Sequence, residues 1–149
     1  MTCYLSLGSN LGDREKHIDN ACRMIAAQCG SVVARSGNHY SEPWGYRSEH
    51  TYLNICIRIE TTLTPIELLD VTQQIERELG RTQKNVYADR IIDIDLLFCI
   101  AGDGAPVTCR SERLTLPHPL MTQRDFVMVP LHEIADGQTI ETYIQNHTQ

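Results

Sequence analysis

Two acidic side chains in the segment 90–98, Arg-Ile-Ile-Asp-Ile-Asp-Leu-Leu-Phe, have the type and spacing needed to bind a metal ion. The β-branched and aliphatic residues around them predict a β-strand. Because side chains alternate between the faces of a strand, Asp93 and Asp95 share one face, with their Cα atoms roughly 7 Å apart. Two neighbouring carboxylates repel each other and require a cation, a basic partner or water. The other face is expected to carry Ile92, Ile94, Leu96 and Phe98.

An exposed strand with acids outside and aliphatics inside would show the same spacing, so the pair alone is ambiguous. Ile91 and Leu97 are expected on the face of the acids, which favours a half-buried cleft over open solvent. Arg90 adds a cation of the kind that binds phosphate. Mg²⁺ accepts one or two carboxylates and completes its shell with phosphate oxygens and water. These local features suggest phosphoryl transfer.

The composition describes one domain, residues 1–149, with a hydrophobic content of 42% and a net charge of −6. This charge argues against a nucleic-acid partner, which requires a basic surface. No stretch approaches the roughly 20 apolar residues of a membrane span. The N-terminus has no basic segment followed by an apolar run, so we expect a cytoplasmic protein without a secretory signal.

The six cysteines are scattered and include no C-x-x-C pair. A buried free cysteine behaves as a small hydrophobe. We therefore expect reduced thiols, not a disulfide framework or a zinc site, at Cys3, Cys22, Cys29, Cys56, Cys99 and Cys109.

Hydrophobic periodicity and end signals predict strands over residues 2–8, 31–40, 51–62 and 90–98, with one helix between Asp13 and Gly30 and another between Thr64 and Gly80. This order, strand–helix–strand–strand–helix–strand, predicts an α+β fold of the ferredoxin-like type, an antiparallel sheet with helices packed on one face. The opposite face would then be free to carry functional residues. Residues 127–134 are expected to be partly helical, with Pro130 limiting the helix start, and the tail from Asp136 to be only partly ordered.

The strand 51–62 is predicted to place Tyr52 and Asn54 on one face. An aromatic ring beside an amide suits an amide-bearing heterocycle, although a decorated sheet edge would look similar. Two loops remain ambiguous. The segment 41–50, which contains Trp44, is more simply a packed surface loop than a ring pocket. The segment 81–89 is a solvated loop by default, although its cations could close over phosphates.

Taken together, several motifs resemble the 6-hydroxymethyl-7,8-dihydropterin pyrophosphokinase family of folate biosynthesis over nearly the whole chain. The motifs are Gly8-Ser9-Asn10-Leu11-Gly12, Tyr52-Leu53-Asn54, Gln73 with Glu76, Gly80-Arg81, the run from Asp89 to Phe98 and the run from Arg113 to Pro119. The resemblance implies an ATP-dependent pyrophosphokinase, which transfers pyrophosphate from ATP to the pterin hydroxymethyl group and releases AMP.

The same resemblance assigns roles by position. Asp93 and Asp95 would hold two Mg²⁺ ions, with Arg81 and Arg90 assisting the chemistry. Tyr52 and Phe126 would stack on the pterin, Asn54 would hydrogen-bond it, and the backbone of Glu42, Pro43 and Trp44 would read its edge. The nucleotide positions would be Gln73, Glu76, Arg90, Arg113, Thr115, His118 and Arg124. The expected ligands are ATP and the pterin, and the expected state is a monomer.

Two rival functions predict different behaviour. A non-catalytic ferredoxin-like module would bind a small molecule without Mg²⁺ dependence or AMP release, and it would leave the paired aspartates unexplained. A protein-interaction domain, with the Trp44 loop as its contact patch, would have no affinity for ATP. The scaffold alone does not choose among these functions, because ferredoxin-like folds host many.

Overall fold

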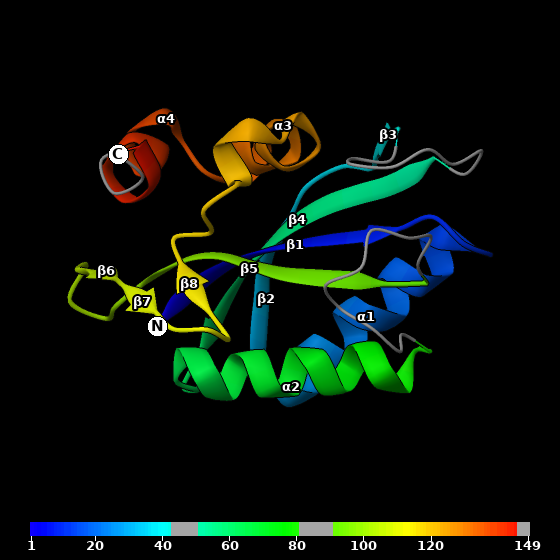
Figure 1. The fold of residues 1–149 in the computed structure, drawn as a ribbon, viewed down its shortest axis with the longest axis horizontal. Coiled ribbons are helices and arrows are strands. Elements are labelled where there is room, and N and C mark those ends of the chain that lie inside the picture. The colour runs from blue at the N-terminus through cyan, green and yellow to red at the C-terminus, as the bar shows by residue number, and fades with distance from the viewer. Residues whose placement is uncertain (43–50, 81–90, 146–149) are drawn as a thin grey trace.

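A computed structural model describes residues 1–42, 51–80 and 91–145 of the chain (Figure 1). The strands are β1 (Thr2–Ser9), β2 (Gly30–Arg35), β3 (His39–Ser41), β4 (Tyr52–Thr61), β5 (Asp93–Ile100), β6 (Pro106–Val107), β7 (Cys109–Arg110) and β8 (Thr115–Leu116). The helices are α1 (Arg14–Gln28), α2 (Pro65–Glu78), α3 (Asp125–Ile134) and α4 (Gly137–Ile140), with a 3₁₀ turn at Met121–Gln123 and a π-helical turn at Glu141–Gln145. In this part of the chain no helix is long and apolar enough to cross a membrane.

The main sheet is antiparallel throughout and runs in the order β2-β4-β1-β5-β6, with β3 also paired to β4. The α+β class and the ferredoxin-like order predicted from the sequence are confirmed. The two long central strands, β1 and β4, pair over the whole length of β1. This pairing fixes which residues of the two strands stand side by side.

Capping residues determine where the two long helices begin. Asp13 caps α1 by accepting a hydrogen bond from the backbone N–H of Lys16 at 3.2 Å. Thr64 and Glu67 form a reciprocal capping box at the start of α2, where Pro65 occupies the first helical position. Each arrangement satisfies backbone donors that the first helical turn leaves open. The starts of both helices were therefore predictable from sequence.

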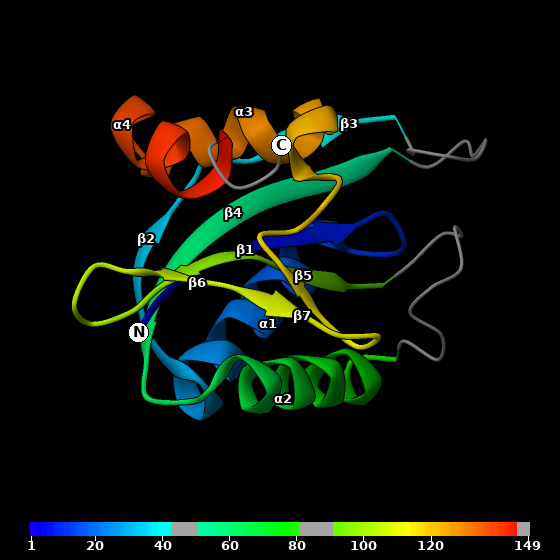
Figure 2. The same cartoon turned by 60° about the vertical axis from the view of Figure 1, so that its left-hand side comes forward.

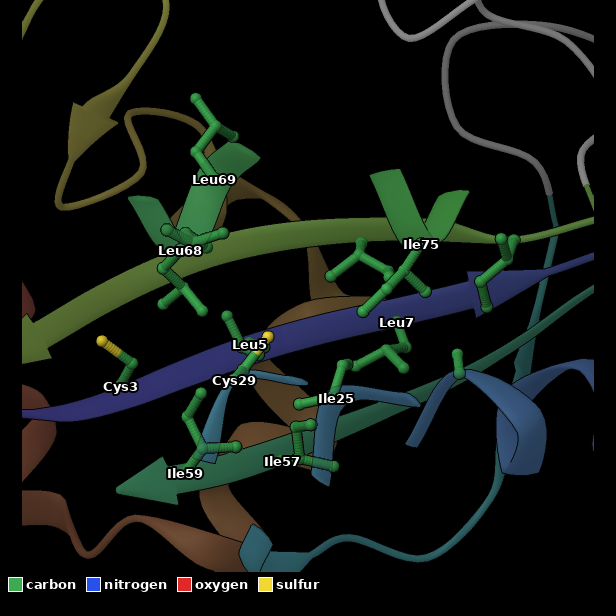
Figure 3. Packing of buried hydrophobic residues seen from close by; sticks show 14 of the residues in the cluster. Cys3, Leu5, Leu7, Ile25, Cys29, Ile57, Ile59, Leu68, Leu69 and Ile75 are labelled. Atoms are coloured by element: carbon green, nitrogen blue, oxygen red, sulfur yellow. The ribbon is translucent and has the colours of Figure 1, made fainter. Parts of the chain in front are cut away.

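The first hydrophobic core lies between the sheet and the helices α1 and α2, on the lower side of Figure 1. Figure 3 shows Leu5 and Leu7 of β1 beside Ile57 and Ile59 of β4, with Leu68 and Ile75 of α2 packed over β5 and β1. The inward alternation predicted for β4 is confirmed, because Leu53, Ile55, Ile57 and Ile59 are all fully buried here.

The sequence predicts that the opposite face of the sheet is free, but the structure shows it partly covered. The helices α3 and α4 cover part of it in both views (Figures 1 and 2), and a second core forms there around Cys56, Leu97 and Leu131. The described part of the tail forms helical turns, and its Ile140 and Ile144 are buried in this core. Pro130 does not limit the start of α3 either: the helix begins at Asp125 and includes the proline.

A β-bulge in β5 corrects the predicted faces of that strand. Leu5 pairs with Leu96 but Tyr4 pairs with Phe98, so Leu97 is the extra residue. One inserted residue reverses the alternation beyond it. Phe98 therefore lies on the second face, not with Ile94, and its ring stacks on Tyr4 with centroids 4.4 Å apart.

The structure also overturns the expectation that all six cysteines are reduced. Cys3 of β1 and Cys99 of β5 are register partners and form a disulfide in the first core. The other four cysteines, Cys22, Cys29, Cys56 and Cys109, are free thiols. The disulfide could not be predicted from the sequence, because Cys3 and Cys99 are 96 residues apart and only the β1–β5 register brings them together.

The single strand predicted over residues 31–40 is two strands, β2 and β3, separated by residues 36–38. The Ser36 N–H donates to Cys56 O, and the Ser36 hydroxyl accepts from the Cys56 N–H, both at 2.9 Å. The short β3 beyond this break is held by Glu133 of α3. That carboxylate accepts from the Gly37 N–H at 2.7 Å and contacts His39 Nε2 at 2.6 Å.

Candidate active site

The two predicted acids lie on the same face of β5, at the end that α3 and α4 leave uncovered. Asp93 and Asp95 are both half-buried. Across the β1–β5 pairing they stand opposite Gly8 and Ser6. A half-buried carboxylate attracts a cation more strongly than one in bulk water, because the local dielectric is lower.

One row of residues crosses the three central strands at this end of the sheet. Gly8 of β1 pairs with Asn54 of β4 on one side and with Asp93 of β5 on the other. Adjacent strands lie about 4.8 Å apart, so the Cα atoms of Asn54 and Asp93 are separated by roughly 10 Å. The central member of the row has no side chain, and the side chains of Asn54 and Tyr52 lie close over it.

The side chains of Tyr52 and Asn54 depend on this glycine. A Cβ atom at Gly8 would lie 3.2 Å from Asn54 Oδ1 and 3.3 Å from Tyr52 Cδ1. Both distances are shorter than the ordinary van der Waals contacts of a Cβ atom. Asn54 is buried, and its Nδ2 donates to Ser41 Oγ of β3 at 2.7 Å. This hydrogen bond sets the orientation of the amide.

Glu76 of α2 reaches the strand that carries the acids. Its buried carboxylate accepts a hydrogen bond from the backbone N–H of Ile94 at 2.8 Å. Ile94 stands between Asp93 and Asp95, so the contact fixes the backbone from which both acids project. A buried carboxylate is stable only where such partners compensate for lost hydration.

Two residues predicted at nucleotide positions meet on the outer side of α2. Arg113, which precedes β8, donates to Gln73 Oε1 at 3.3 Å and forms an ion pair with Asp70. Both partners are on α2, and Arg113 and Asp70 are exposed. The structure thus joins the α2 and β8 parts of the predicted nucleotide site.

Two hydrogen bonds hold His118, one through its backbone and one through its ring. Its N–H donates to Leu97 O, the carbonyl of the bulge residue, at 2.7 Å. Its Nδ1 accepts from the N–H of Leu120 at 3.2 Å. An Nδ1 that accepts a hydrogen bond carries no proton, so Nε2 is the protonated nitrogen of the neutral ring.

The structure also describes the remaining residues of the predicted set. Phe126, in the first turn of α3, is half-buried, and the Arg124 guanidinium lies 5.7 Å from its ring centroid. Thr115 of β8 and Glu42 are exposed. Four predicted site residues, Pro43, Trp44, Arg81 and Arg90, lie outside the described residues.

The donor chemistry fits Mg²⁺ only if a substrate completes its shell. In the residues described, no group of three or more His, Cys, Asp or Glu side chains could hold a metal ion. Asp93 and Asp95 supply two carboxylates, which is the number that Mg²⁺ takes where phosphate and water provide the other ligands. The pair therefore matches a shared metal–phosphate site better than a closed structural metal site.

Sequence reasoning missed two residues that shape this site. Gly8 was recognised only as part of a motif, and Ser41 was not identified at all. The role of Gly8 follows from its register between Asn54 and Asp93, and that of Ser41 from the pairing of β3 with β4. Registers of this kind are not readable from one sequence.

A family model described as 7,8-dihydro-6-hydroxymethylpterin-pyrophosphokinase (HPPK) matches residues 4–136. Several curated relatives are named 2-amino-4-hydroxy-6-hydroxymethyldihydropteridine pyrophosphokinase. The relative from Porphyromonas gingivalis is 46% identical over 135 residues, which cover 89% of each chain. The relative from Methylorubrum extorquens is 45% identical over 92% of this chain and 84% of its own. The relative from Bacillus subtilis is 39% identical, with coverages of 88% and 76%.

Solved structures share the fold at low identity. One is described as HPPK-DHPS in complex with substrates, and it matches 99% of this chain with a TM-score of 0.65 and 12% identity. Another, HPPK-DHPS from Plasmodium falciparum, matches 88% with a TM-score of 0.64 and 14% identity. This chain spans 42% and 40% of those two chains, so the likeness concerns the fold of that part alone.

Proposed function

Since this chain belongs to the 7,8-dihydro-6-hydroxymethylpterin-pyrophosphokinase family, we propose that its active site spans β4, β1 and β5, with the pterin on one side of Gly8 and the triphosphate on the other. The chain is an ATP-dependent pyrophosphokinase of folate biosynthesis, which acts on 6-hydroxymethyl-7,8-dihydropterin. The relatives named above are enzymes, so a non-catalytic binding module is not favoured.

The row Asn54–Gly8–Asp93 is the observation that carries this proposal. At one end of the row stands a pair of residues suited to bind the ring, Tyr52 and Asn54. At the other end stands the pair of acids suited to bind a metal ion, Asp93 and Asp95. The reacting hydroxymethyl group must lie between the ring and the phosphates. The missing side chain at Gly8 lets the Tyr52 and Asn54 side chains lie close to the strand that separates them from the acids.

On the pterin side, the Tyr52 ring offers a flat surface for stacking, and Asn54 offers a fixed amide. Because Asn54 Nδ2 is already bonded to Ser41, its Oδ1 is the atom oriented to accept from an amino or ring N–H group. Phe126 supplies a second aromatic surface from α3. The backbone of Glu42, Pro43 and Trp44 is assigned to the pterin edge, as the family resemblance suggests.

On the nucleotide side, Asp93 and Asp95 would hold two Mg²⁺ ions together with the phosphates of ATP. Bound there, the ions would supply charge neutralisation for the phosphates and for the attacking and leaving oxygens. Glu76 holds the strand between the two acids. The side chains assigned to the nucleotide are Gln73, Glu76, Arg90, Arg113, Thr115, His118 and Arg124.

The transfer forms a bond between the hydroxymethyl oxygen and the β-phosphorus of ATP. It breaks the bond from that phosphorus to the α–β bridging oxygen, so AMP leaves and the hydroxyl proton passes to solvent. Phosphoryl-type transfer depends mainly on positioning and charge stabilisation. The two aspartates, with Arg81 and Arg90, are assigned to that work, and no side chain is assigned as a general base.

The test is an AMP-release assay with purified protein, ATP, Mg²⁺ and 6-hydroxymethyl-7,8-dihydropterin. AMP should form only when all four are present. Omission of the pterin or the metal provides the controls. ADP formation would contradict the proposed attack at the β-phosphorus, and pterin binding without any nucleotide product would favour the binding-module alternative.

Two further assignments belong to this proposal. The enzyme acts as a monomer, because the row of site residues comes from strands of one chain; light scattering at assay concentrations tests this. It acts in the cytoplasm, where its co-substrate ATP is abundant. The Cys3–Cys99 disulfide is unusual for that compartment, which makes the thiol count in the Discussion informative.

A further inference from the structure

Arg14, the first residue of α1, joins two strands that carry the pterin side of the site. Its guanidinium Nη1 donates to Thr51 O at 2.9 Å and to Thr51 Oγ1 at 2.7 Å. The same guanidinium lies over the Tyr40 ring, 5.0 Å from its centroid. The Tyr40 hydroxyl in turn donates to Glu15 Oε1 at 3.1 Å. The first turn of α1 therefore holds the start of β4 and the middle of β3.

One contact lies next to a residue assigned to the pterin, and the other lies next to a hydrogen-bond partner of such a residue. Thr51 immediately precedes Tyr52. Tyr40 immediately precedes Ser41, which accepts the hydrogen bond from Asn54 Nδ2 at 2.7 Å. A shift of Thr51 would therefore be passed to Tyr52, and a shift of Tyr40 would be passed through Ser41 to the Asn54 amide.

Helix stability does not account for an arginine at this position. The N-terminal end of a helix dipole is positive, so a cation in the first turn is unfavourable there. The compensating interactions are the carbonyl and hydroxyl of Thr51 and the face of the Tyr40 ring. A planar guanidinium can donate at its edge while its face covers an aromatic ring, which an ammonium cannot do.

We infer that Arg14 is a positioning residue for pterin binding, acting through Thr51 on Tyr52 and through Tyr40 on the Ser41–Asn54 pair. This inference rests on the proposed function, in which Tyr52 and Asn54 contact the pterin. It predicts an effect on pterin affinity that is separate from ATP affinity, because Arg14 touches neither α2 nor β5 in the contacts described above.

The experiment compares Arg14→Ala with Arg23→Ala, an exposed arginine on the same helix whose side chain bonds only to Asn20 among the contacts described. KM for pterin, KM for ATP, kcat and Tm are measured for each. Loss of charge-assisted hydrogen bonds should raise the pterin KM roughly tenfold in Arg14→Ala. KM for ATP should stay within about twofold of the unmodified protein, and Arg23→Ala should match the unmodified protein throughout.

Two further variants keep the test decisive if Arg14→Ala folds poorly. Arg14→Lys retains a donor for Thr51 but loses the planar group over Tyr40, so its pterin KM should lie between those of the unmodified protein and Arg14→Ala. Tyr40→Leu should raise the pterin KM on its own, and should add less in the Arg14→Ala background, because the two side chains act through one contact.

Several outcomes would overturn the inference. These are an unchanged pterin KM, equal increases in KM for pterin and ATP, or full additivity of Arg14→Ala and Tyr40→Leu. Asn54→Ala separates this inference from the proposed function. If Asn54→Ala leaves pterin affinity intact, the assigned pterin site is wrong. If Asn54→Ala weakens pterin binding and Arg14→Ala does not, only the positioning role fails.

Discussion

The carboxylate of Glu76 accepts a hydrogen bond from the backbone N–H of Ile94, at 2.8 Å, in the middle of the strand that carries Asp93 and Asp95. β6 pairs with β5 only at Cys99 and Ile100. It therefore offers no acceptor for the backbone N–H of Ile94, which needs one from a side chain. Glu76 does this from α2. The contact links the helix that carries Gln73 to the backbone that carries both acids.

Removal of the Glu76 carboxylate should lower the stability of the protein. In Glu76→Ala the Ile94 N–H loses its buried acceptor, which should cost about 1–3 kcal/mol of unfolding free energy. Glu76→Gln keeps an acceptor and should unfold close to the unmodified protein. Urea unfolding measures the difference, with Glu78→Ala, an exposed carboxyl on the same helix, as the control. Equal stability of Glu76→Ala and Glu78→Ala would contradict the role given to this contact.

Replacement of either acid should strongly lower turnover without unfolding the protein. Asp95→Ala and Asp93→Asn remove a carboxylate whose interaction with Mg²⁺ contributes several kcal/mol, so kcat should fall at least about a hundredfold. The AMP-release assay measures the loss, and circular dichroism checks the fold. Asp19→Asn, on the surface of α1, is the matched control. A folded Asp95→Ala protein with near-normal activity would remove Asp95 from the metal site.

A methyl group at Gly8 should weaken pterin binding selectively. In Gly8→Ala the new Cβ lies 3.2 Å from Asn54 Oδ1 and 3.3 Å from Tyr52 Cδ1, so both side chains must move. The pterin KM should rise severalfold while KM for ATP changes little. Gly102→Ala is the control, because a Cβ atom there meets nothing within 4 Å. Unchanged pterin kinetics in Gly8→Ala would mean that the ring and the amide do not need their present positions.

Glu133 should make the stability of the protein depend on pH in the acid range. The Gly37 N–H hydrogen bond and then the nearby His39 lower the pKa of this carboxyl below its ordinary value of 4.5. The unfolded chain therefore binds the proton more tightly, and this stabilisation is present above about pH 4.5 and is lost as the pH falls through the folded-state pKa.

The difference in Tm between the unmodified protein and Glu133→Gln should consequently shrink from pH 6 to pH 3. Differential scanning calorimetry across this range measures it. Glu112→Gln, an exposed carboxyl between β7 and β8, serves as the control. A Tm difference that stays constant with pH would show that the Glu133 charge does not stabilise β3.

The number of reactive thiols should distinguish the disulfide from the reduced state. Unfolded, unreduced protein should expose four thiols, and six after reduction, because Cys3 and Cys99 are joined. In the native protein the half-buried Cys22 and Cys109 should react before Cys56, since burial, aided by the charge of Glu133, raises the pKa of the Cys56 thiol to about 12. Alkylation and mass spectrometry measure both. Six thiols without a reductant would rule out the disulfide in the purified protein.

Local signals in the sequence determined the order of the main elements and the chemistry of the site. The Asp13 cap and the Thr64–Glu67 capping box involve residues at most three apart, so each helix start could be predicted from its own neighbourhood. The alternation of β4 was equally local. The family motifs indicated pyrophosphoryl transfer because each is a short run of residues, and their order and spacing along the chain can be read from the sequence.

The tertiary structure alone decided which residues face one another. The bulge at Leu97 turned Phe98 to the second face, and the β1–β5 register joined Cys3 to Cys99. The placement of Gly8 between Asn54 and Asp93, and the reach of Arg14 to Thr51 and Tyr40, arise from strands and a helix that are distant in sequence. Such contacts depend on register and packing, which are set by the whole core and not by any one segment.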